Sequence, residues 1–155
     1  MRYIAIQGRD YDLFWELANG YYREGEDADT PQAEMDAFIR FLFDKVTAGE
    51  LAGCFAVEDE KTVGFALWAL DTEEFAFSEM PGLGTIAEIG LLPDCRGQGQ
   101  GRLLAAFAES QLRERGKAQC YVSAYGPAQK FWRSCGYRES GKSAGNGLPI
   151  FVKDL

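Results

Sequence analysis

The sequence contains no histidine among its 155 residues, and its four cysteines show no CxxC spacing. A Ser–His or Cys–His catalytic dyad is therefore excluded, and we expect no zinc site. No run of about 18 apolar residues is present, so we expect no membrane-spanning helix. The chain becomes polar by Gln7, unlike a secretory signal, and free thiols suit a cytoplasmic protein.

Basic side chains are scarce in the first part of the chain, and acidic ones are scarce in the second. The net charge is -8, but residues 1–95 carry 20 acidic and 6 basic side chains (net -14). Residues 96–155 carry 4 acidic and 10 basic side chains (net +6). This division is either a solvated acidic face or a sign that one part meets a cation and the other a polyanion. We expect neither a nucleic-acid partner, because no long basic stripe is present, nor a membrane partner.

The hydrophobic pattern predicts helices and strands mixed along the chain. Apolar side chains at three- and four-residue spacing predict helices, and short apolar runs bounded by turn residues predict strands. Neither repeats nor a linker interrupt residues 1–155, so we expect one mixed α/β (α+β) domain with about six or seven strands in a central mixed sheet flanked by helices. The expected helices are 11–22, 31–49 with Thr30 as its cap, one outlined by residues 103–112 and closed by Gly116, and 127–134. The expected strands are 2–7, 51–57, 62–70, 85–92, 118–124, 137–140 and 149–153; the runs 51–57 and 62–70 predict a hairpin, and residues 141–147 a loop.

Three glycines alternate with polar residues in the segment RGQGQG, residues 96–101, between a predicted strand and a predicted helix. The spacing does not fit a P-loop, because Arg102 and Leu103 stand where Lys and Ser or Thr are needed after the last glycine. It does not fit a GxGxxG dinucleotide fingerprint either, because the third glycine would have to be at position 102 or 104, which holds Arg102 or Leu104. Glycines still allow close backbone approach, and a helix N-terminus offers unpaired N–H groups. The segment therefore predicts a pyrophosphate site. The alternative is a turn into the helix that binds no ligand.

Two motifs together resemble those of the GNAT family of acetyl-CoA-dependent N-acetyltransferases. The first is Arg-x-x-Gly-x-Gly, which follows an apolar-x-Pro strand end and precedes a Leu-Leu helix. The second is AQKFWRSCGY, residues 128–137, with its closing Gly-Tyr. The predicted order of elements is also the family's order. The resemblance implies a single GNAT-like domain.

The resemblance also implies where acetyl-CoA binds. Backbone N–H groups of the glycine segment would hold the pyrophosphate. The strand around residues 89–91 would pair with the pantetheine arm, from which the strand at 118–124 would splay. Gly90 marks either such a close approach or simple packing under a helix. The implied cofactor-binding residues are Ile89, Gly90, Leu91, Arg96, Gly97, Gln98, Gly99, Gln100, Gly101, Arg102 and Trp132.

Glu88 is the candidate catalytic base, because it is a lone carboxylate within an apolar strand. Burial would raise its pKa toward the range useful for deprotonating an amine. Acidic side chains near this position are common in the family and often act through a water. The alternative is that Glu88 points to solvent or pairs with a basic residue. Glu73, Glu74 and Glu79 are weaker candidates, and a backbone N–H at 89–91 is the candidate oxyanion donor.

The sequence departs from the family where many members carry a tyrosine that protonates the leaving thiolate. That position holds Trp132, whose indole N–H can donate a hydrogen bond but cannot usefully transfer a proton. Trp132 is then a wall for the pantetheine arm or plain core packing. Tyr125 is the alternative source of a hydroxyl.

Among the acidic residues before the glycine segment, four in or beside the connector at 71–84 favour a cationic acceptor amine, either a small molecule or a peptide amine: Asp71, Glu73, Glu74 and Glu79. Direct transfer of acetyl to a primary amine is thus the predicted reaction, and a homodimer is the assembly that the family suggests. The alternative function is a coenzyme A-binding sensor or interaction module without turnover.

Overall fold

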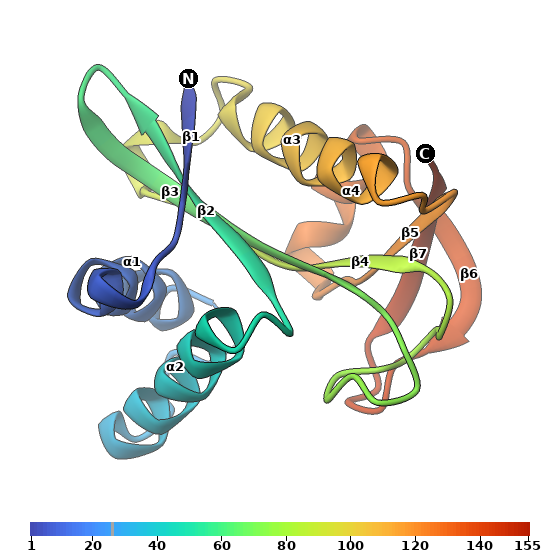
Figure 1. The fold of residues 1–155 in the computed structure, drawn as a ribbon, viewed down its shortest axis with the longest axis horizontal. Helices are drawn as coiled ribbons and strands as arrows, with labels where there is room; N and C mark the ends of the chain where they lie inside the picture. The colour runs from blue at the N-terminus through green and yellow to red at the C-terminus, as the bar shows by residue number, and fades with distance from the viewer. Residues whose placement is uncertain (26) are drawn as a thin grey trace. The chain divides into compact units, whose positions relative to one another are not determined.

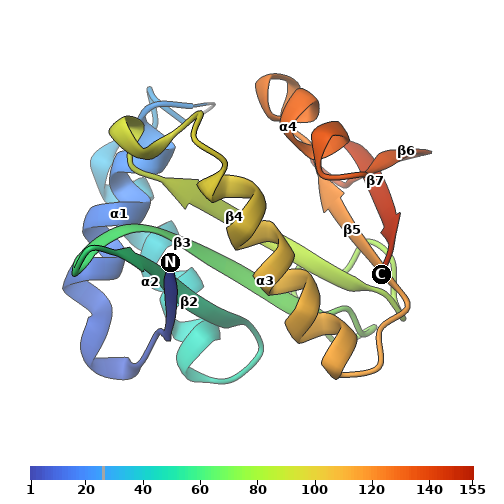
Figure 2. The ribbon, with the colours of Figure 1, turned by 90° about the horizontal axis from the view of Figure 1, so that it is seen from above.

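The structure is a computed structural model that describes residues 1–25 and 27–155. Seven strands form one sheet in the order β1-β2-β3-β4-β5-β7-β6, accompanied by helices (Figure 1 and Figure 2). The β4–β5 pair is parallel, whereas the β1–β2, β5–β7 and β6–β7 pairs are antiparallel. This confirms the predicted mixed sheet. The strands are β1 (Arg2–Ala5), β2 (Ala52–Glu58), β3 (Lys61–Leu70), β4 (Gly84–Leu91), β5 (Gln119–Ser123), β6 (Arg138–Ser143) and β7 (Pro149–Asp154).

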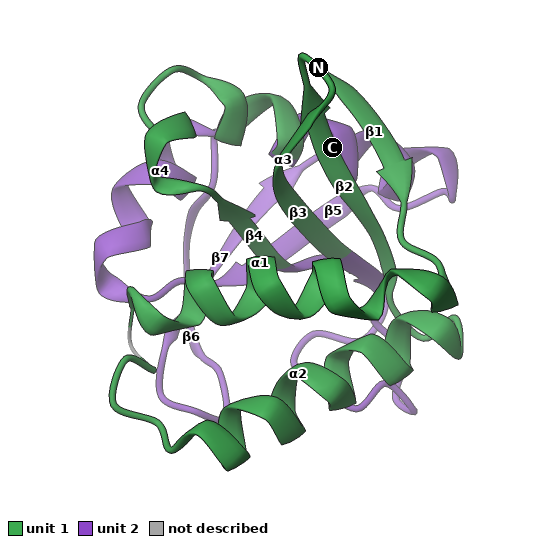
Figure 3. Ribbon diagram, turned by 90° about the vertical axis from the view of Figure 1, so that its left-hand side faces the viewer, with its two compact units in different colours: residues 1–67, 88–104 green, residues 68–87, 105–155 purple. Residues whose placement is uncertain are grey.

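The chain divides into two compact units, residues 1–67 with 88–104 and residues 68–87 with 105–155 (Figure 3). We call them unit 1 and unit 2. The helices are α1 (Tyr11–Arg23), α2 (Gln32–Thr47), α3 (Gln100–Glu114) and α4 (Gln129–Ser134). Helices α1 and α2 belong to unit 1, α4 belongs to unit 2, and α3 begins in unit 1. No helix in the described ranges is long and apolar enough to cross a membrane.

In unit 1, α1 and α2 lie side by side and cover one face of β2 and β3 (Figure 3). Apolar side chains at helical spacing on both helices form this contact. The ring of Phe14 lies 5.7 Å from that of Phe43 on α2 and 5.5 Å from that of Phe65 on β3. Phe14 and Phe65 are fully buried, so they form the centre of the core of this unit.

The predicted hairpin between the second and third strands is confirmed. Asp59 and Glu60 alone connect β2 to β3, and both have a positive φ, 47° and 62°. Two successive residues with positive φ are the requirement of a type I′ turn, whose twist matches that of the flanking strands.

The predicted start of the second helix at Pro31, with Thr30 as its cap, is wrong by one residue. Helix α2 begins at Gln32, after Pro31 in an extended conformation, and no side chain caps it. The Arg23 guanidinium donates hydrogen bonds to the carbonyl oxygens of Ala28 and Thr30. These bonds join the end of α1 to the turns before Pro31, and Pro31 rather than Thr30 occupies the cap position of α2.

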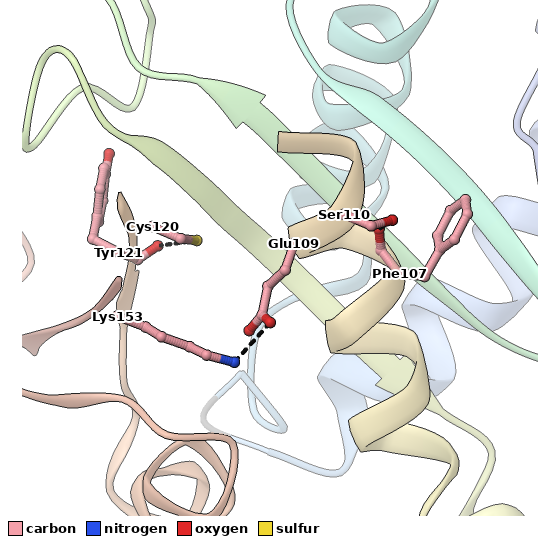
Figure 4. Close-up of polar contacts among 6 residues, drawn as sticks. All are labelled: Phe107, Glu109, Ser110, Cys120, Tyr121 and Lys153. Carbon is pink, nitrogen blue, oxygen red and sulfur yellow. Dashed lines mark hydrogen bonds and ion pairs between the residues drawn. The ribbon is translucent and has the colours of Figure 1, made fainter. Parts of the chain in front are cut away.

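In unit 2, a buried ion pair joins α3 to β7. The Lys153 Nζ donates to Glu109 Oε2 at 2.7 Å, and Figure 4 shows the two side chains pointing toward each other. Glu109 is 4% exposed, and the same ammonium lies 5.6 Å from the centre of the Tyr137 ring. A charge this deeply buried requires a partner, which Lys153 supplies.

Strand β6 extends three residues beyond the predicted end at residue 140, into the stretch predicted as a loop. Its pairing with β7 is irregular between Glu139 and Ser143, and Gly141 there has φ +83°. A glycine with positive φ lets the strand bulge at Gly141 and then resume its pairing with β7. Because glycine is also typical of turns, the sequence here predicted a loop instead of a continued strand.

Candidate active site

The glycine segment forms the turn between β4 and α3 in unit 1. Gly97 and Gly99 have φ +76° and +93°, while Gln98 between them does not have a positive φ. This alternation points successive N–H groups to one side, as in an anion-binding nest. None of the described residues accepts a hydrogen bond from the N–H groups of Gly97, Gln98 or Gly99. A Cβ at either glycine would meet nothing within 4 Å, so the space beside the turn is open.

Arg96, one of the implied cofactor-binding residues, is engaged in other contacts in the structure. Its guanidinium donates to the carbonyl oxygen of Leu91 through Nε at 3.0 Å and Nη2 at 2.9 Å. Its Nη1 pairs with Glu24 Oε2, just after α1, at 2.7 Å. The side chain therefore fixes the turn to the end of β4 and to α1, and its charge is neutralised. Arg102 is exposed and keeps its charge near the turn.

Gly90 is required by close packing in unit 1. A Cβ at this position would lie 2.6 Å from Phe65 Cε1 and 3.1 Å from Tyr21 Cγ. A Cβ at Gly64 would in turn lie 2.3 Å from the Gly90 carbonyl oxygen. The packing interpretation of Gly90 is therefore confirmed. Ile89 and Leu91, on either side, are half-buried.

Glu88 lies on β4, near the last turn of α1. Burial raises its pKa from 4.5 to about 7, against a lowering by the Tyr22 hydroxyl and with a further rise from the charge of Asp27. The side chain is half-buried rather than fully enclosed, so solvent still reaches part of it. No ion pair in the described part of the chain includes Glu88. The predicted direction of its pKa is therefore confirmed, and the alternative of a basic partner is not observed.

A pocket of about 180 Å³ opens in unit 1 beside α1 and the end of β4. Tyr21 lines the pocket, and its own pKa is raised by burial and by the negative charge of Glu88. Tyr21 thus lies within the electrostatic influence of the candidate base. The lining residues from α1 and the residue after it are Glu16, Leu17, Gly20, Tyr21 and Glu24; Gly64, residues 90–93 and Arg96 complete the lining.

The first two helices are among the elements that the family resemblance implies for the acceptor pocket, but sequence reasoning did not single out the α1 residues that line it. Glu16, Gly20 and Glu24 follow one another at four-residue spacing, which puts them on one helix face. That spacing was visible in the sequence, but nothing in it showed that this face would meet the end of β4.

The two predicted aromatic candidates, Trp132 and Tyr125, belong to unit 2, whereas Glu88 and the glycine turn belong to unit 1. Trp132 is 7% exposed, and its ring lies 5.0 Å from Phe131 and 5.1 Å from Tyr137. These contacts are those of a core residue. Tyr125 is 37% exposed, so its hydroxyl group is accessible.

Asp71, predicted to attract a cationic acceptor, is instead a structural residue of unit 2. It is 1% exposed, and its Oδ2 accepts hydrogen bonds from the Tyr121 hydroxyl at 2.6 Å and from two backbone N–H groups. Burial acts to raise its pKa, but the hydrogen bonds outweigh burial and lower the pKa. Glu79 accepts a hydrogen bond from the Gly145 N–H at 2.9 Å, while Glu73 and Glu74 are exposed.

No group of three or more acidic or cysteine side chains in the described residues could hold a metal ion. The site that remains combines a glycine turn at a helix N-terminus, whose N–H groups have no described acceptor, with a half-buried carboxyl group of raised pKa. Both lie beside a pocket with carboxylates in its lining. A glycine turn of this kind fits a phosphorylated group, and a carboxyl that is partly ionised at neutral pH fits proton transfer.

The sequence matches the model of the acetyltransferase (GNAT) family over residues 11–137, and the chain belongs to that family. No curated protein matches the sequence significantly.

Solved structures share the fold at low sequence identity. One is a PaiA N-acetyltransferase from Thermoplasma acidophilum in complex with coenzyme A (TM-score 0.73, 13% identity, 100% of each chain covered). A second is an acetyltransferase from Thermus thermophilus (TM-score 0.76, 18% identity, 99% of this chain and 96% of that chain covered). A third is an aminoglycoside N-acetyltransferase in complex with CoA (TM-score 0.66, 16% identity, 89% of this chain and 88% of that chain covered).

Proposed function

We propose that this acetyltransferase moves the acetyl group of acetyl-CoA directly onto the primary amine of a cationic small molecule or peptide. The observation that carries the proposal is Glu88, whose pKa of about 7 suits a base at neutral pH, in the same unit as an anion-binding turn. The family match spans parts of both units, which supports one catalytic domain over residues 1–155. Coenzyme A in two of the structural relatives supports the acyl donor.

The glycine turn fits the pyrophosphate of coenzyme A. Its alternating conformation, its N–H groups without a described acceptor and the open space beside Gly97 and Gly99 are what a bound diphosphate requires. We assign the pyrophosphate to the backbone of residues 96–102. Acetyl-CoA, when bound, supplies the acetyl group as an activated thioester. For the pantetheine arm to pair with the Leu91 carbonyl, the Arg96 guanidinium must first leave that oxygen.

Glu88 acts as the general base in this proposal. An amine is protonated in neutral water and becomes a nucleophile only after it gives up that proton. A carboxylate with a pKa near 7 accepts the proton more readily than an ordinary one and is still substantially ionised. Because Glu88 is half-buried, the proton transfers either directly or through solvent. We assign the stabilisation of the developing oxyanion to a backbone N–H among Ile89, Gly90 and Leu91.

The leaving thiolate takes no proton from Trp132 in this proposal. That side chain is a buried indole, which cannot transfer a proton usefully. Tyr125 is the exposed phenol that remains as a candidate acid.

The acceptor's positive charge is recognised by carboxylates of unit 1 in place of Asp71. Glu16 lines the pocket and has no basic partner among the described residues, Asp27 acts electrostatically on Glu88, and Glu24 is paired with Arg96. Negative charges around one small pocket raise the local concentration of a cation and orient it. The pocket volume of about 180 Å³ suits an aminoalkyl group rather than a whole large molecule.

The test is release of coenzyme A thiol from acetyl-CoA across a panel of primary amines, cationic and neutral, matched in length. Glu16→Gln should raise KM for the cationic amines about fivefold, with kcat retained. The matched control is Glu34→Gln, an equal charge change at an exposed position of α2. Equal KM values for neutral and cationic amines would contradict the cationic acceptor. Tight coenzyme A binding without thiol release on any amine would show a non-catalytic binding module.

A further inference from the structure

Tyr22, in the last turn of α1, is a buried residue whose hydroxyl group has no ordinary structural role. Its exposed fraction is 6%. Its ring lies 5.2 Å from that of Tyr21 and 5.4 Å from that of Phe38 on α2. These contacts fix the direction of the ring, and therefore of the hydroxyl at its end. Buried hydroxyl groups almost always have a hydrogen-bond partner, so an exception needs an explanation.

The hydroxyl of Tyr22 makes no hydrogen bond of standard geometry to any residue that the structure describes. Apart from burial, the group that acts on it most strongly is the Glu88 carboxyl, through its charge and through hydrogen bonding. The Tyr22 hydroxyl and the Glu88 carboxyl are therefore close enough to interact, although no hydrogen bond of standard geometry joins them. The end of α1 also abuts β4 close to Glu88, since the Tyr21 ring packs against Gly90.

We propose that Tyr22 is a positioning residue for Glu88: its hydroxyl donates a hydrogen bond to the ionised carboxylate, orients it, and favours its base form. The inference rests on the proposed function in that Glu88 is the base. Tyr22 itself touches neither substrate in this proposal.

The electrostatic surroundings of Glu88 explain why such a donor is needed. Burial and the charge of Asp27 both favour the protonated carboxyl, whereas the Tyr22 hydroxyl opposes them. Tyr21 also faces Glu88 and interacts with Arg96, but the charge of Arg96 is paired with Glu24. Tyr22 is thus the neighbour that stabilises the ionised form, and without it Glu88 would be less ionised near neutral pH.

The experiment compares the wild-type chain with Tyr22→Phe. The first readout is the pH profile of kcat/KM for an amine from the panel. The second is a carbon-13 NMR titration of the Glu88 carboxyl, assigned with Glu88→Gln, which requires no turnover. We expect both pKa values to move upward by about one unit in Tyr22→Phe. Activity should fall about tenfold on the acid side and be unchanged at high pH.

The matched control is Tyr11→Phe, the same substitution at the first residue of α1, where the ring packs on Phe43. It should leave the pKa of Glu88 unchanged. A purely structural role of Tyr22 would lower activity equally at every pH and leave the titration in place. If Tyr22→Phe does not fold, 3-fluorotyrosine at position 22, a stronger donor, should move the pKa of Glu88 downward.

The two readouts separate this inference from the proposed function. An upward shift in the NMR titration supports the role of Tyr22 even if no amine is acetylated, an outcome that would overturn the proposed function alone. Conversely, an active enzyme whose Glu88 titrates identically in wild type and Tyr22→Phe overturns the role of Tyr22 and leaves the proposed function standing.

Discussion

Replacing Glu88 with glutamine should stabilise the protein at neutral and alkaline pH. The pKa of Glu88 rises from 4.5 in the unfolded chain to about 7 in the folded one. The folded state therefore binds a proton more tightly than the unfolded state. Stability is highest below the unfolded pKa and decreases as the pH rises through 4.5 to about 7, above which the loss is complete.

The size of the effect follows from this shift of between two and three pKa units. Each unit corresponds to about 1.36 kcal/mol, so ionisation of Glu88 costs about 3 kcal/mol of folding free energy once the pH exceeds about 7. Glutamine has nearly the same shape and never ionises. Glu88→Gln should therefore match the wild type near pH ~4 and exceed it by up to about 3 kcal/mol near pH ~8, or roughly 6–12 °C in Tm.

The assay is urea unfolding of both proteins at a series of pH values from about 4 to 9, with the difference in unfolding free energy plotted against pH. Glu34→Gln, at an exposed position, is the control that should give a flat difference. A flat difference for Glu88→Gln as well would refute the burial of this carboxyl. Stabilisation together with loss of acetyl transfer would show that the base is retained at a cost in stability.

Three further substitutions test other parts of the structure. Gly99→Ala forces φ +93° on a residue with a Cβ, so it should lower the unfolding free energy by about 1 kcal/mol and weaken coenzyme A binding measured by calorimetry. The control is Gly116→Ala, with φ +81° and equally open space, which should lower the unfolding free energy as much and leave coenzyme A binding unchanged. Gly90→Ala would place a Cβ 2.6 Å from Phe65 and should lower unfolding free energy by about 1–3 kcal/mol in urea, whereas a neutral result would disprove the packing. Asp71→Asn should lower the unfolding free energy by about 1–3 kcal/mol near neutral pH. Because folding lowers the pKa of Asp71, protonation in acid removes the same ionised carboxylate from the wild type, so the difference between the two proteins should shrink as the pH falls. A difference that stays constant with pH would contradict this expectation.

The order of the helices and strands could be predicted because it depends on local patterns. Apolar spacing located α1 and β3, and the glycine turn was placed correctly between a strand and a helix. The errors arose where distant groups decide. Pro31 rather than Thr30 occupies the cap position of α2, after turns whose carbonyl oxygens at Ala28 and Thr30 accept hydrogen bonds from Arg23. Strand β6 continues past Gly141 because pairing with β7 resumes at Ser143, which no local pattern records.

The same division applies to the site. The sequence by itself determined the family and the glycine turn and singled out Glu88 as the candidate base, because these depend on residue types at fixed spacing. Only the tertiary structure decided which charges are free. Folding pairs Arg96 with Glu24 and places Glu16 of α1 in the lining of the pocket. It also buries Asp71, whose Oδ2 accepts three hydrogen bonds. A side chain's charge state and partner depend on burial and on residues far along the chain, and these exist only once the chain has folded.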